Sequence, residues 1–130
     1  MKIDLIVIVR DMVVDGGAVA VLVWDLAAGG DRAIGDEPDR IQSIPPLSTI
    51  GVVAFKQIPA GRYAVAALQL AEQPRDAEWT FCELPVAQIG STGIGFATGA
   101  PLSTGAVALS TSTILTVHLE PVSALCTTLH

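Results

Sequence analysis

Two carboxylates and four aromatic residues are the side chains in this sequence whose types could do chemistry together. Asp25 directly follows Trp24 at the end of an apolar segment, and Glu83 lies shortly after Trp79. An apolar cup that encloses a carboxylate raises its pKa and suits it to general acid or base catalysis. We therefore predict Asp25 and Glu83 as candidate catalytic residues if the protein is an enzyme. The candidate ligand-binding residues are Trp24, Tyr63, Trp79 and Phe96.

The same residues have a purely structural interpretation, in which the aromatic rings fill the core and Asp25 caps a turn. Two functions therefore stay open. The first is a non-catalytic binding or assembly module that binds a hydrophobic small molecule or another copy of itself. The second is a cofactor-free enzyme of the cyclase or isomerase type, which would act on a hydrophobic biosynthetic intermediate by shape and carboxylate catalysis.

No other residue spacing in the sequence indicates a cofactor or a metal ion. The only cysteines, Cys82 and Cys126, are separated by 43 residues, which is not a metal-ligand spacing. They can be two small buried apolar residues, a disulfide or, for one of them, a catalytic thiol. His118 is expected on the polar face of the last strand and His130 is the terminal residue, so both are expected to face solvent.

The composition predicts which partners the protein has. The net charge is −6, and Lys2 and Lys56 are the only lysines, so neither nucleic acid nor an anionic membrane surface is an expected partner. Hydrophobic residues make up 51% of the chain and charged residues only 15%, compared with about 25% charged in ordinary soluble domains. An apolar surface of this kind is typical of interfaces. We therefore expect a homo-oligomer.

The N-terminal sequence bears on localisation. Its apolar run is short and closed by Arg10 and Asp11, so it does not resemble a secretory signal peptide. No apolar run approaches the ~18–20 residues of a transmembrane helix, which predicts no membrane insertion. The sequence thus predicts a cytoplasmic protein, or an exported one if a leader has been removed.

Short β-branched segments predict strands that would position the candidate residues. Ile3–Val9 and Ala18–Trp24 are apolar on both faces and are expected to pair as an antiparallel hairpin around Asp15-Gly16-Gly17. The stretch Phe55–Leu70 predicts a strand, a tight turn at Pro59 and Gly61, and a second strand. Further strands are expected at Ile41–Ile44, Gly105–Ser110 and Thr113–Glu120, and loops at Ala27–Pro46, AEQPRDAE and Pro85–Pro101.

These strands and turns, without an amphipathic helix of normal length, predict an all-β fold. We expect a single antiparallel β-sandwich, or a partly closed barrel, of about seven strands with two long loops. At 130 residues the chain predicts one domain. Its core would span about 3–120, with a short tail at 121–130.

Several of these motifs resemble the bacterial family catalogued as domain of unknown function 2141. They are the strand GGAVAVLVWD, the corner FKQIPAGRYAVAAL, the loop GIGFATGAP and the pair AVALS and TILTVHLE. The resemblance implies a transthyretin-like or Ig-like sandwich, usually exported, and no assigned activity. The family's acidic segment after the corner looks able to bind Ca²⁺, but here it reads QLAEQPRDAEWTFCE, so no metal site is expected. The matching residues are Phe55, Pro59, Gly61, Tyr63, Ala64, Val65, Gly93, Gly95 and Phe96.

Overall fold

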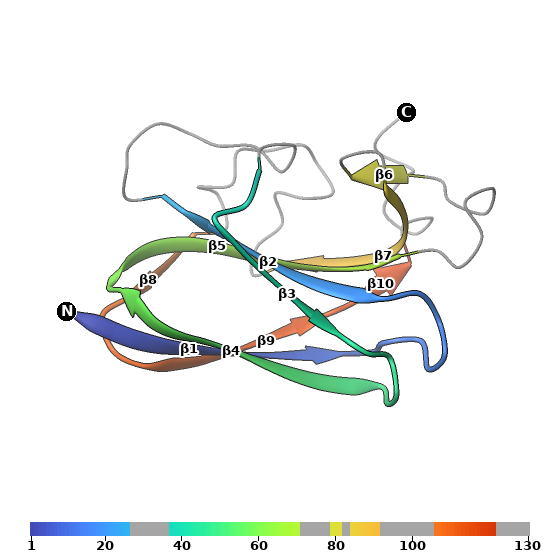
Figure 1. Ribbon diagram of the computed structural model, residues 1–130, viewed down its shortest axis with the longest axis horizontal. Coiled ribbons are helices and arrows are strands. Elements are labelled where there is room, and N and C mark those ends of the chain that lie inside the picture. The colour runs from blue at the N-terminus through green and yellow to red at the C-terminus, as the bar shows by residue number, and fades with distance from the viewer. Residues whose placement is uncertain (27–36, 71–78, 82–83, 92–105, 122–130) are drawn as a thin grey trace.

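Two β-sheets packed face to face make up the part of the chain that the computed structural model describes, residues 1–26, 37–70, 79–81, 84–91 and 106–121 (Figure 1). The described residues contain no helix, which confirms the predicted all-β class. The strands are β1 (Lys2–Arg10), β2 (Val19–Asp25), β3 (Arg40–Ile44), β4 (Ile50–Pro59), β5 (Gly61–Leu70), β6 (Trp79–Phe81), β7 (Leu84–Ser91), β8 (Val107–Leu109), β9 (Thr113–His118) and β10 (Glu120–Pro121).

The pairing of the strands gives a sandwich and not a closed barrel. One sheet has three strands in the order β4-β1-β9, and the other has seven, five of them in the order β10-β7-β5-β2-β3. In the second sheet β6 also pairs with β7, and β8 pairs with β5. The pairs among the described strands are antiparallel except for β1 and β9, which are parallel.

Alternating side chains of β1 and β5 show where the core lies. In β1 the residues Ile3, Leu5, Val7 and Val9 are buried between the sheets, whereas their neighbours are not fully buried. In β5 almost every side chain is buried, because one face packs in the sandwich and the other belongs to a second apolar cluster. Strands covered on both faces lose the polar alternation of a half-exposed sheet.

The predicted hairpin of the first two strands is wrong. β1 pairs with β4 and β9, and β2 pairs with β3 and β5, so the two lie in different sheets. The Asp15-Gly16-Gly17 turn carries the chain from one sheet to the other. Gly17 is required there, because a Cβ at this position would lie 2.0 Å from the backbone oxygen of Leu70.

Two buried glutamines hold this crossing in place. Gln69 accepts a hydrogen bond from the Val13 amide at 2.8 Å and donates to the carbonyl oxygens of Val13 and Gly17 at 2.8 and 3.1 Å. Gln88 donates to Gln69 Oε1 at 2.9 Å and to the Asp11 carbonyl oxygen at 3.1 Å. Side chains of the second sheet thus supply hydrogen-bond partners for several backbone groups around the turn. Buried polar groups require such partners.

The corner predicted at Phe55–Leu70 is confirmed, and it joins the two sheets. β4 ends at Pro59, the amide of Ala60 donates to the Met1 carbonyl oxygen at 3.1 Å, and β5 begins in the opposite sheet. The non-glycine residue with a positive φ near this corner is Gln57, at 58°. Its amide donates to Asp4 Oδ1 at 3.0 Å, beside the point where the β1–β4 register shifts.

The loop predicted at Pro85–Pro101 is wrong in its first part, because Leu84–Ser91 forms the strand β7. Gln88 and Gly90 concealed the strand in the sequence, since neither residue favours a β-strand core. The edge strand predicted at Ile41–Ile44 is confirmed as β3. The alternation predicted for the last strand is also confirmed: Val117 and Leu119 are buried, and His118 is exposed.

Candidate functional site

The seven-stranded sheet separates Trp24 and Tyr63, the two predicted aromatic site residues whose side chains are described. Trp24 is buried in the apolar cluster on the outer side of this sheet, and Tyr63 is buried between the sheets. The structure therefore does not bring these two rings into one cup. The backbone of Trp79 lies in β6, opposite Val86. Glu83, Phe96, Cys82 and Cys126 lie outside the described residues.

Asp25 and Tyr63 are the two predicted site residues that the structure places together. They are direct partners across β2 and β5. Only 1% of the Tyr63 surface is exposed, and its hydroxyl donates to the Pro59 carbonyl oxygen. Burial raises the pKa of the Tyr63 phenol, and the negative charge of Asp25 raises it further. At neutral pH the phenol is therefore a protonated donor and not a base.

Two further polar residues at this end of the sheet were missed by sequence reasoning. Asp39 Oδ2 accepts a hydrogen bond from the Asp25 amide at 2.6 Å, and the Asp39 amide donates to the Val23 carbonyl oxygen at 2.9 Å. Arg40, the next residue, acts on the Tyr63 phenol and lowers its pKa, opposing Asp25. In the sequence both belong to the run DRAIGDEPDR, whose charges predicted only a loop.

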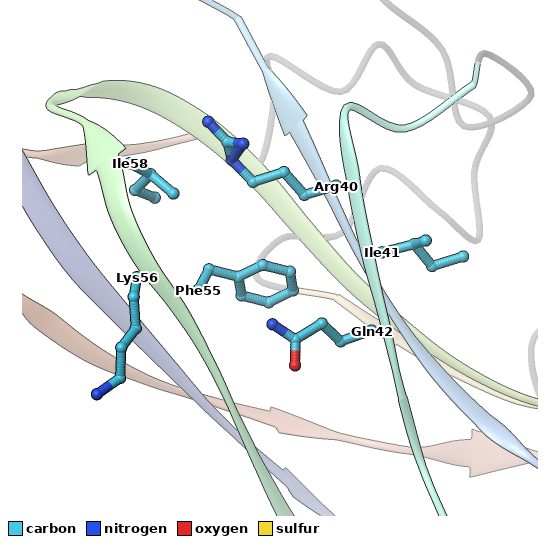
Figure 2. A pocket seen from close by; sticks show the side chains of 6 residues that line it. All are labelled: Arg40, Ile41, Gln42, Phe55, Lys56 and Ile58. Carbon is cyan, nitrogen blue, oxygen red and sulfur yellow. The ribbon is translucent and has the colours of Figure 1, made fainter.

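Arg40 also lines the β3–β4 groove, a hollow of about 280 Å³ between the edge strand of one sheet and the edge strand of the other. Gln42 Nε2 donates to the Ala54 carbonyl oxygen at 2.6 Å and so joins the two strands at one end of the groove. Figure 2 shows the Phe55 ring directed toward β3, with the Arg40 side chain above it. The lining residues are Arg40, Ile41, Gln42, Phe55, Lys56 and Ile58.

A different surface, which we call the apolar face, covers the outer side of the three-stranded sheet. Across the strands, Ile6 lies between Ala54 and Ile114, and Ile8 lies between Val52 and Thr116. The exposed fractions of Ile114 and Val52 are 62% and 59%. Ile6 and Ile8 are half-buried, so the second apolar face that the sequence indicates for β1 is not fully covered within one chain. The apolar face consists of Ile6, Ile8, Ile50, Val52, Ala54 and Ile114.

In the described part of the chain, no group of three His, Cys, Asp or Glu side chains is placed to hold a metal ion. No helix among these residues is long and apolar enough to cross a membrane.

Comparisons with known proteins identified no relative of this chain. A scan against protein-family models, a search of curated proteins and a search of solved structures each found no match to this chain. The resemblance to the family catalogued as domain of unknown function 2141 therefore stays a prediction from the motifs.

Proposed function

We propose that this protein is a non-catalytic β-sandwich module that assembles by packing its apolar face against that of a second copy. The observation that carries this proposal is the exposure of β-branched residues along three adjacent strands. β1 and β4 of this sheet are antiparallel, and the solvent face of half-exposed antiparallel strands is normally polar. An isolated exposed Ile needs no explanation, whereas a contiguous apolar surface is typical of an interface.

The charges around the apolar face favour a second copy as the occupant. One end of the face carries Lys2, Asp4 and Lys56, and the other carries Arg10 and Asp11. Each end thus presents both signs of charge. A second copy can therefore meet opposite charges in either orientation, as a self-complementary interface requires.

The size of the apolar face sets the expected strength of the assembly. Three strands at ~4.8 Å spacing, each contributing about six residues at ~3.3 Å, cover on the order of 300 Å². Two such faces bury less than ~1,200 Å², the lower limit of a standard-size interface. We therefore expect a reversible dimer with a dissociation constant in the micromolar range or weaker.

The β4 edge of the three-stranded sheet is less suited to assembly than the apolar face. Gln42 already donates to the Ala54 carbonyl oxygen of β4, and so occupies an acceptor that an added strand would use. Blocking of edge strands in this way is a common protection against edge-to-edge pairing.

The alternative, a cofactor-free enzyme using Asp25 or Glu83, receives less support. The Tyr63 hydroxyl beside Asp25 is bonded to the Pro59 carbonyl oxygen. Trp24 lies on the other side of the sheet, so the apolar cup that would raise the pKa of the carboxylate lacks one of its rings.

Sedimentation velocity over a concentration series tests the proposed assembly. The sedimentation coefficient of the wild-type protein should rise with concentration from the monomer value toward that of a dimer. Ile114→Glu, which places a charge in the interface, should weaken association at least tenfold. Ile41→Glu is the matched control, because Ile41 is 60% exposed on a strand outside the apolar face.

Circular dichroism of both variants establishes that they fold. A wild-type protein that stays monomeric at every concentration would overturn the proposal. Equal weakening by Ile114→Glu and Ile41→Glu would overturn the assignment of the interface to this face.

A further inference from the structure

We propose that the β3–β4 groove binds a small amphipathic carboxylate, whose charged group bonds to Arg40 and whose short apolar chain lies against Phe55 and Ile58. This site borders the apolar face, and Lys56 lies at the edge of both, but it does not depend on the proposed assembly. It also differs from the aromatic cup that the sequence predicts, because it uses neither Trp24 nor Trp79.

The apolar part of the groove is provided by two core residues. Phe55 and Ile58 are nearly fully buried and belong to the core cluster between the sheets. Their positions are fixed by that packing, so the groove is formed before any ligand arrives. Preformed apolar surfaces of this kind hold small ligands without a large ordering cost.

The volume of the groove limits the size of the ligand. About 280 Å³ lies just below the usual range of ligand pockets. A chain of a few carbon atoms with one polar end fits such a space.

The polar side chains that line the groove favour an anion. Arg40 and Lys56 are cationic, Gln42 supplies an amide, and the six lining residues include no carboxylate. In Figure 2 the Lys56 ammonium extends away from the Phe55 ring, which leaves Arg40 as the cation next to the apolar surface. A guanidinium binds a carboxylate through paired N–H donors, which an ammonium cannot reproduce.

The Nε atom of Arg40 supplies the most specific indication of a ligand. In the described part of the structure this atom is buried and has no hydrogen-bond partner. A buried donor without an acceptor is costly, and the few that occur in native proteins call for an explanation. A carboxylate oxygen in the groove would accept this hydrogen bond.

The acidic residues close to Arg40 limit the strength of binding. Asp39 directly precedes Arg40, and its Oδ2 accepts a hydrogen bond from the Asp25 amide at 2.6 Å, so both acidic residues lie at the same end of the sheet as Arg40. They offset part of its attraction for an anion. We therefore expect an affinity of about 1 mM, as is typical of ligands with few atoms, and a strong dependence on the apolar chain.

Titration of the isotope-labelled protein with hexanoate, followed by amide NMR shifts, tests the site. Saturable shifts are expected at the amides of Ile41, Gln42 and Lys56. Hexanamide has the same chain without the charge and should bind at least fivefold more weakly. Acetate, which keeps the charge without the chain, should produce no saturable shift in the same concentration range.

Two variants test whether binding requires the guanidinium group itself or only its positive charge. Arg40→Lys keeps the charge and removes the Nε donor, so it should weaken hexanoate binding about tenfold. Arg62→Lys is the matched control on an exposed residue outside the groove and should leave binding unchanged. Equal binding of hexanoate and hexanamide to the wild-type protein would overturn the proposal without any variant. So would the absence of saturable shifts, or shifts confined to the apolar face.

Discussion

Tyr63 is the only tyrosine in the chain, so its titration can be measured without interference from another phenol. Its ring is buried between the sheets, opposite Asp25 on the neighbouring strand. Burial is the larger cause of its raised pKa and the Asp25 charge is the second. Sequence analysis selected this residue for its aromatic ring, but the protonation of its hydroxyl depends on neighbours that only the strand register reveals.

Alkaline pH should therefore destabilise the fold through Tyr63. Below the ordinary pKa of about 10 the phenol is protonated in both states and adds no pH dependence. Above that value the unfolded chain releases the proton first, so the free energy of unfolding falls as pH rises toward the raised pKa of the folded state. Ultraviolet absorbance of the tyrosinate should give a midpoint above 10 in the folded protein.

Tyr63→Phe is the control for this prediction. The variant loses one hydrogen bond, worth about 1 kcal/mol, and should show a flatter decline of denaturant stability at alkaline pH. An ordinary tyrosine midpoint in the folded protein would contradict the prediction.

Gln69 shows what a single sequence conceals at the residue scale. In the sequence it only interrupts an apolar run, yet 1% of its surface is exposed and it satisfies three backbone atoms of the first crossing. The partners lie more than 50 positions away. No local pattern therefore distinguishes this residue from an exposed glutamine.

Gln69→Leu should lower the free energy of unfolding by about 3–5 kcal/mol, because several buried polar groups lose their partner at once. Chemical denaturation measures the loss. Gln42→Leu is the matched control, since Gln42 is exposed and makes one bond, to Ala54, and it should cost no more than about 1 kcal/mol. Similar losses in the two variants would show that the buried network adds little.

At the scale of elements, local patterns predicted the strands better than their partners. The corner at Pro59, the edge strand β3 and the alternation of β9 follow from turn residues and periodicity, and the structure confirms them. The hairpin of β1 with β2 was wrong because both strands carry apolar residues on both faces, and such strands carry no information about which neighbour they pair with. β7 was missed because it contains Gly90 and the buried Gln88.

The close packing of another chain segment explains why a glycine stands at position 90, and this explanation can be tested by substitution. The chain passes from β9 in one sheet to β10 in the other close to β7, and a Cβ on Gly90 would lie 2.2 Å from the His118 carbonyl oxygen. Gly90→Ala must displace backbone and should cost about 3 kcal/mol or more. Gly51→Ala is the control, because its nearest contact is a side-chain methyl group, Ile44 Cγ2, at 2.6 Å.

Thermal unfolding of the two alanine variants makes this comparison. Gly90→Ala should unfold at a clearly lower temperature than Gly51→Ala. The reverse order would mean that the crossing from β9 to β10 tolerates a wider separation from β7.

For the whole molecule, composition predicted an apolar surface but not its place. A charged fraction of 15% in a chain of 130 residues indicates that part of the surface is apolar, and several arrangements of strands satisfy that condition. The apolar face becomes identifiable only when β4, β1 and β9 are known to be neighbours, which depends on pairings between distant segments. The β3–β4 groove likewise becomes identifiable only when both sheets are known, because each sheet supplies one of its two strands.

If the apolar face joins two copies, stability should depend on protein concentration. Mass action favours the folded dimer as concentration rises, so a hundredfold increase above the dissociation constant should raise the unfolding temperature by several degrees, about 3–8 °C. Ile41→Glu should retain this dependence, whereas Ile114→Glu should lose it and match the wild-type protein at low concentration. Differential scanning calorimetry measures all three. An unfolding temperature that is constant in the wild-type protein would mean that the exposed isoleucines stay in water, and that the low charge of this chain does not reflect assembly.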